Sequence, residues 1–192
     1  VIVVKTNAKY FRISPPLNGT YRIINRRDVV FVTRDELKPA TEYEVSVDVD
    51  RLRPNGKKWL FGTSFDFKTP DFVVTGLRAF YNFDVVRNRE KNVVGELNFN
   101  YPVALAELKK HVRMDLDKNE IRFDIEPSNF PTRFYIKSGP VARKDYDTYV
   151  KIVVTEGLPC INGTTPLDDD SEHSLVLPEK TRLPVDDVRS YP

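Results

Sequence analysis

The chain has 192 residues, of which 40% are hydrophobic and 30% charged, and its formal net charge is +2. This balance indicates a folded globular protein rather than a disordered tail, and no apolar run approaches the roughly 20 residues that span a bilayer. Basic and acidic residues are mixed, which argues against the basic stripe of a nucleic-acid-binding protein, and a single cysteine excludes an internal disulfide and a zinc site of paired cysteines.

The chain begins with Val1 instead of Met and opens with the apolar run Val1-Ile2-Val3-Val4. We therefore expect an excised piece or a processed form of a larger protein, in which missing targeting signals say little about location. The 12 Phe and 9 Tyr favour β-strands, because flat rings fit a half-buried pleated surface.

Alternation of apolar and polar residues predicts most of the secondary structure. In residues 43–50 every odd position is apolar or aromatic and every even one polar, which gives a strand one buried and one exposed face. The same pattern, in full or shortened, predicts strands at 29–32, 64–68, 97–101, 112–116, 121–126, 132–137 and 148–154. Residues 104–111 are a helix candidate too short to be stable without packing on a sheet. Several half-buried strands separated by turn residues indicate a sandwich or a barrel. Of these we predict an all-β chain built as antiparallel β-sandwiches.

Proline-containing breaks divide the chain. The strand that ends at Lys68 is followed by Thr69 and Pro70, and a new apolar run begins at Phe72. We predict two tandem immunoglobulin-like β-sandwich domains, at 1–70 and 71–178, with 179–192 as a linker or the start of a next domain. Because a complete immunoglobulin-type sandwich needs about 100 residues, we expect the first domain to lack its first strand.

Two tyrosines stand at the start of predicted late strands. Tyr43 follows Pro39-Ala40-Thr41-Glu42, and Tyr149 follows Asp145-Tyr146-Asp147-Thr148. Such a tyrosine can bond back to the preceding turn, as the tyrosine corner of Greek-key sandwiches does. We predict that role for Tyr43, with an ordinary strand aromatic as the alternative there, and also for Tyr149.

Several segments resemble known bacterial domains. Residues 37–45 and 65–70 resemble immunoglobulin-like modules of bacterial surface proteins. Residues 95–103, Leu108 and Val112 look like the strand, short helix and strand of the N-terminal macroglobulin domains of bacterial alpha-2-macroglobulin-like proteins. Residues 149–154, 157–159 and 175–178 fit the same pattern, and the long versions from Bacteroidetes-type bacteria fit best. The resemblance covers most of 72–178 and, more loosely, 20–70.

Proteins of that family are very large, secreted or membrane-anchored, and trap proteases after cleavage of a bait region, in some cases through a thioester. The thioester motif places Gln three residues after Cys, whereas Cys160 is followed at that distance by Gly163. The resemblance therefore implies a non-enzymatic scaffold segment in the periplasm or on the cell envelope, with no cofactor. Its implied partners are neighbouring domains of the same polypeptide and, through the parent, target proteases. We expect a monomeric fragment and no nucleic-acid partner.

Residues that could carry chemistry have structural interpretations. Cys160 lies in a turn-like segment without a recognisable histidine signature, so we interpret it as structural rather than nucleophilic. The acidic run 168–170 with Glu172 lacks the alternate spacing of a calcium loop and is interpreted as exposed. The glycosylation-type triplets at Asn18 and Asn162 are interpreted as turns, and the basic run 109–113 as solvated surface.

Two other functions remain open. A surface adhesin or carbohydrate-binding module would need exposed aromatic rings on one sheet face or loop tip. The candidates are Trp59, Tyr81, Phe83 and Tyr135, although we interpret Trp59, in its expected hairpin, as a core residue rather than a sugar-stacking platform. An accessory domain of a secreted hydrolase would have a catalytic domain beside it in the full-length protein. The sequence suggests no catalytic, cofactor-binding or metal-binding residues for this chain.

Overall fold

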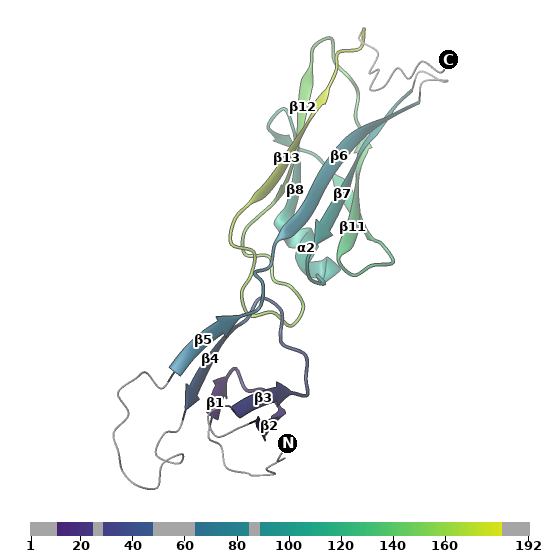
Figure 1. The fold of residues 1–192 in the computed structure, drawn as a ribbon. Coiled ribbons are helices and arrows are strands. Elements are labelled where there is room, and N and C mark those ends of the chain that lie inside the picture. The colour runs from purple at the N-terminus through teal and green to yellow at the C-terminus, as the bar shows by residue number, and fades with distance from the viewer. Residues whose placement is uncertain (1–10, 25–28, 48–63, 85–88, 182–192) are drawn as a thin grey trace, which may run out of the picture. The chain divides into compact units, whose positions relative to one another are not determined.

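The computed structural model describes residues 11–24, 29–47, 64–84 and 89–181. Within these ranges the regular structure consists of antiparallel strands and one short helix (Figure 1). This confirms the predicted all-β class, with sheets arranged as in β-sandwiches. Contacts between Cα atoms group the chain into two compact units, Val1–Asp71 with Asn162–Thr165, and Phe72–Ile161 with Pro166–Pro192.

The first unit contains a small sheet and a hairpin. The sheet has the order β1-β4-β5, formed by β1 (Phe11–Ser14), β4 (Glu42–Val47) and β5 (Ser64–Lys68). The hairpin pairs β2 (Gly19–Ile23) with β3 (Val29–Thr33). Tyr43 is fully buried, and its ring stacks on Phe67 with 5.0 Å between the ring centroids. The alternation predicted for residues 43–50 therefore places the odd-numbered Tyr43 and Val45 in the core.

Tyr43 forms the predicted tyrosine corner. Its hydroxyl oxygen accepts a hydrogen bond from the backbone N–H of Lys38 at 2.8 Å. Beside it, the Thr69 hydroxyl accepts the N–H of Thr41 at 2.8 Å and donates to the Lys38 carbonyl at 2.9 Å. These bonds fix the turn before β4 and the residue after β5 together, which explains why an aromatic side chain with a hydroxyl stands at position 43.

The second unit contains two four-stranded sheets. One has the order β10-β11-β7-β6 and is made of β6 (Val74–Asp84), β7 (Arg89–Phe99), β10 (Phe123–Pro127) and β11 (Arg133–Pro140). The other has the order β13-β12-β8-β9 and is made of β8 (Val112–Leu116), β9 (Asn119–Glu120), β12 (Thr148–Val154) and β13 (Ser171–Leu177). The short helix α2 (Leu105–His111) precedes β8 and confirms the helix predicted at 104–111. It buries Leu108.

The inner faces of these sheets form an apolar core. Leu97 and Ile136 from one sheet and Met114 and Ile152 from the other are fully buried. Gly95 on β7 lets the layers approach closely, because a Cβ atom there would lie 3.1 Å from the Cδ1 atom of Ile152. This absence of a side chain sets the local spacing of the two sheets.

The structure extends the predicted strands and adds others. The strand predicted at 97–101 is the end of the much longer β7, and β6 and β13 were not predicted as strands. In β6 an irregular register between Val74 and Gly76 breaks the alternation. In β13 the inward positions include the polar Ser171 and His173. The alternation of apolar and polar residues that identifies a strand is therefore missing from its first half. The predicted domain types and boundaries remain predictions.

Candidate functional site

A hollow lined by polar, charged and aromatic residues lies on the outer face of the β13-β12-β8-β9 sheet, in the second unit. Its volume is about 490 Å³, within the range of roughly 300–1,000 Å³ typical of small-molecule sites. Strand β8 and the turn after it, β12 and β13 each contribute to its lining, which consists of Asp115, Asp117, Lys118, Tyr149, Lys151 and Ser174. The hollow combines an aromatic ring with hydrogen-bonding groups of both kinds.

Alternation along β12 turns Tyr149 outward. Val150 and Ile152 point into the core and are fully buried, so Tyr149 and Lys151 lie on the opposite face. Tyr149 is 58% exposed, and its cross-strand neighbour on β13 is Val176, which is 48% exposed. The Tyr149 ring lines the hollow, and Val176 lies beside it on the same face of the sheet. The prediction of a tyrosine corner at Tyr149 is therefore wrong, because its side chain faces solvent.

The turn between β8 and β9 holds Tyr149 in place. Its two residues, Asp117 and Lys118, have φ angles of 48° and 68°, as the right-handed twist of a two-residue hairpin demands. The Asp117 N–H donates to the Tyr149 carbonyl at 2.9 Å, and the Tyr149 N–H donates to Oδ1 of Asp117 at 2.9 Å. Asp117 thus clamps the backbone of Tyr149 on both sides.

Asp117 also pairs with a cation. Its Oδ2 atom accepts a hydrogen bond from Nζ of Lys144 at 3.0 Å. The backbone N–H of Tyr149, and then the ammonium group of Lys144, lower the pKa of Asp117 below its ordinary value of 3.8. The carboxylate is therefore ionised at neutral pH and supports both the turn and the strand beside it.

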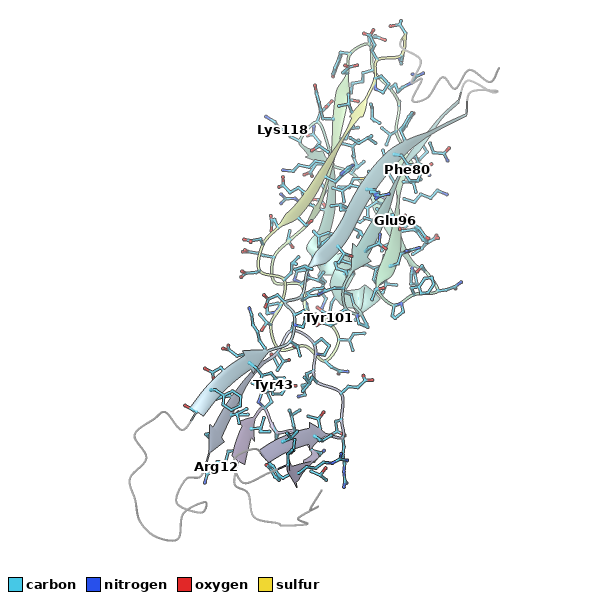
Figure 2. The ribbon with its side chains drawn as sticks, viewed as in Figure 1. Arg12, Tyr43, Phe80, Glu96, Tyr101 and Lys118 are labelled. Atoms are coloured by element: carbon cyan, nitrogen blue, oxygen red, sulfur yellow. The ribbon has the colours of Figure 1, made fainter. Side chains whose placement is uncertain are left out.

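The charges around the hollow balance. The lining carries the carboxylates of Asp115 and Asp117 and the ammonium groups of Lys118 and Lys151. Lys151 also contacts Glu172, with 2.7 Å between the nitrogen and a carboxylate oxygen. In the part of the chain that the structure describes, Lys118 (Figure 2) and the hydroxyls of Tyr149 and Ser174 make no hydrogen bond within the protein. These groups are available to a ligand.

Cys160 lies in the interior of the second unit, in the segment between β12 and β13. Its side chain is 6% exposed, and Leu158 beside it is fully buried. The next residue, Ile161, donates its N–H to the carbonyl of Pro102 at 2.8 Å. Nδ1 of His111 lies 3.0 Å from the carbonyl oxygen of Glu107 in its own helix. The burial of Cys160 fits the structural role expected for it.

The acidic run 168–170 lies in the loop before β13, and Asn162 lies in a turn, as predicted. The prediction of a turn at the other triplet is wrong, because Asn18 ends a loop and Gly19 and Thr20 begin β2. Oδ1 of Asp170 accepts the N–H of Glu156 at 2.8 Å, which joins two loops of the second unit. Asn162 has a φ angle of 63°, in the left-handed region that asparagine tolerates. Nδ2 of Asn18 donates to Asp35 at 2.6 Å. Among the described residues, no group of three or more His, Cys, Asp and Glu side chains could hold a metal ion, and no helix is long and apolar enough to cross a membrane.

Of the aromatic candidates for a binding row, the structure describes the side chains of Tyr81 and Tyr135. The Tyr81 hydroxyl donates to the Val141 carbonyl at 2.9 Å and its ring is partly buried. Tyr135 is 40% exposed and lies opposite Glu96, on the face that also carries the exposed Phe80 (Figure 2). Trp59 and the side chain of Phe83 lie outside the described residues.

The first unit contains an apolar hollow of about 330 Å³. It lies among the strands and the segments that follow β1 and β3, and Thr33 is its one polar lining residue; the others are Ile13, Leu17, Phe31, Leu37, Val45, Phe65 and Phe67. Val45 is buried, whereas Phe65 and Leu37 are exposed, so the hollow is an open apolar depression with little polar chemistry.

The sequence by itself did not reveal the hollow around Tyr149. Tyr149 and Lys151 were assigned to a strand, but β13, which supplies Ser174, was not predicted. The alternation of Tyr149 and Lys151 with Val150 and Ile152 was the available signal, because it separates an outward pair from a buried pair. The pairing of β12 with β13 and β8 places Ser174 and Asp115 beside Lys151. The sequence alone does not give this register, because the paired segments lie far apart in the chain.

Comparison with known proteins gives one informative similarity. The chain is 20% identical over 184 residues to the alpha-2-macroglobulin homolog of Yersinia pestis. The alignment covers 93% of this chain, whereas the chain spans 9% of the length of that protein. No protein-family model matches the chain. The similarity supports a relationship to alpha-2-macroglobulin-like proteins, in agreement with the resemblance seen in the sequence.

Proposed function

We propose that this chain is a non-catalytic structural segment of a large bacterial alpha-2-macroglobulin-like protein that traps proteases. The observation that carries the proposal is the similarity to the Yersinia pestis protein, which extends over 93% of the chain. A similarity of this extent includes residues of both compact units, so the two units follow each other in the aligned part of that protein as well. The macroglobulin-domain resemblance of residues 72–178 gives the second unit the same assignment.

The interior of the second unit supports a scaffold role. The facing sheets meet through fully buried apolar side chains, including Leu97, Ile136 and Ile152. Such close packing resists deformation and can hold neighbouring domains at a fixed orientation. Cys160 is buried in this unit, and the glutamine of a thioester motif is replaced by Gly163. The covalent capture step, where the parent protein has one, belongs to another part of it.

The proposal includes a location and partners. We assign the parent to the Bacteroidetes-type long versions of the family, and its location to the periplasm or the cell envelope. The partners of this segment are then the adjoining domains of the same polypeptide, and proteases meet it through the complete parent protein.

Protease inhibition assays test the proposal. The 192-residue chain is mixed with trypsin, subtilisin or thermolysin at equimolar ratio, and cleavage of a small peptide and of casein is followed. The isolated chain should leave both rates unchanged, whereas the full-length parent should slow casein cleavage more than peptide cleavage, because trapping hinders large substrates. Stoichiometric inhibition by the isolated chain, or a parent without effect on casein cleavage, would contradict the proposal.

A further inference from the structure

We propose that the hollow around Tyr149 binds an uncharged carbohydrate, with a pyranose ring stacked on the tyrosine. This function is independent of the scaffold role and of the row of aromatics that the sequence suggested. It rests on the shape of the hollow, the fixed backbone that carries the ring, and the chemistry of the groups around it.

The stacking platform is preorganised. Tyr149 is held by backbone hydrogen bonds of 2.9 Å in both directions with Asp117, and Val150 anchors the next position in the core. The backbone that carries the exposed ring is therefore fixed before a ligand arrives, so little backbone freedom is lost on binding. Val176 continues the apolar surface beside the ring. A pyranose presents apolar C–H groups on its flat face, and these match an aromatic surface that is otherwise wet.

The polar groups fit hydroxyls. A sugar hydroxyl both donates and accepts, so its site needs donors and acceptors side by side. Lys118 and Lys151 donate, the carboxylates of Asp115 and Asp117 accept, and Ser174 does either. Asp117 already receives one hydrogen bond on each carboxylate oxygen, and each oxygen has lone-pair capacity left.

Charge selects among ligand classes. With two carboxylates and two ammonium groups the lining is formally neutral. An anionic ligand would meet Asp115 and Asp117, and a cationic one would meet Lys118 and Lys151, each at an electrostatic cost. A neutral ligand with many hydroxyls meets no such repulsion. The volume of about 490 Å³ suits a small ligand or a short stretch of a polysaccharide chain.

Calorimetric titration of the 192-residue chain with cellohexaose, maltohexaose and N-acetylchitohexaose tests the proposal, with an oligogalacturonate as the charged comparison. At least one neutral oligosaccharide should bind more tightly than the charged one. Tyr149→Ala should weaken that binding by about tenfold or more, as loss of a stacking ring does, whereas Tyr149→Phe keeps the ring and should stay within about threefold. Tyr135→Ala, on the other sheet, is the matched control and should bind as the unmodified chain does.

A second variant guards against misfolding. Ser174→Ala removes one hydroxyl from the exposed side of β13 and should weaken binding by about threefold without disturbing the clamp on Tyr149. Amide NMR shifts caused by the sugar should centre on β12, β13 and the β8–β9 turn. The proposal is overturned if none of the three neutral oligosaccharides binds, if only the charged one binds, or if Tyr149→Ala and Ser174→Ala bind as tightly as the unmodified chain.

Discussion

Tyr43 shows how one hydroxyl secures a loop in the first unit. The ring is fully buried against Phe67, and the oxygen accepts the N–H of Lys38, five residues earlier. Packing alone would be satisfied by phenylalanine, so the hydroxyl serves the backbone. A partly buried N–H that loses its acceptor carries a penalty, because water reaches it poorly.

Tyr43→Phe is therefore expected to lower the free energy of unfolding of the first unit by about 1–3 kcal/mol. Tyr135→Phe, where the ring is exposed, is the matched control and should change it by less than about 0.5 kcal/mol. Urea denaturation followed by circular dichroism measures both. Equal effects of the two substitutions would show that the bond to Lys38 contributes nothing specific.

Asp117 gives the second unit a dependence on acid. Its pKa is lowered in the folded chain, first by the N–H of Tyr149 and then by Lys144, below the ordinary value of 3.8. A lowered pKa means that the ionised carboxylate stabilises the fold above the ordinary value, and that this contribution is lost as the pH falls through the lowered one.

Asp117→Asn should therefore destabilise the chain near neutral pH, and its difference from the unmodified chain should shrink below about pH 4. Asparagine tolerates the left-handed backbone of this position, so the comparison isolates the charge. Denaturation at several pH values measures the difference, and carboxyl NMR gives the pKa directly. Lys144→Met should raise the pKa of Asp117 towards 3.8; a difference independent of pH would refute the assignment.

At the scale of the elements, Gly95 controls how the β7 strand meets β12. A Cβ atom at this position would lie 3.1 Å from Cδ1 of Ile152 and 3.3 Å from the carbonyl oxygen of Arg78. This carbonyl oxygen belongs to the backbone of the sheet, so it cannot move far to make room for a Cβ atom. Gly139 on β11 offers a natural comparison, because a Cβ atom there would meet nothing within 4 Å.

Gly95→Ala should destabilise the second unit by about 1–3 kcal/mol more than Gly139→Ala, since the added methyl group overpacks the core. Both substitutions restrict the unfolded chain equally, so their difference reports the native contact. Chemical denaturation of the two variants provides the measurement. Equal stabilities would mean that the sheets separate without cost at this point.

At the scale of the whole molecule, each compact unit has its own core of fully buried hydrophobic side chains. Tyr43 occupies that position in the first unit, and Leu97 and Ile152 in the second. Units that bury separate cores can unfold separately, because the loss of one core does not expose the other.

Calorimetry of the complete chain should accordingly show two unfolding transitions. Tyr43→Phe should move one of them and Gly95→Ala the other, each to lower temperature by several degrees. A single transition that both substitutions shift together would indicate one cooperative unit. The same scans supply a folding control for the protease and carbohydrate assays.

The sequence alone determined the class of the fold, because apolar and polar residues alternate with the period of a strand and local periodicity needs no tertiary partner. It also located the helix before β8 and the tyrosine corner at Tyr43, whose signals lie within a few residues. Only the tertiary structure decided that Tyr149 faces outward beside Ser174 and Asp117, and that β6 and β13 are strands. These features depend on register between segments distant in the chain, and a shift of one residue would turn each side chain to the opposite face.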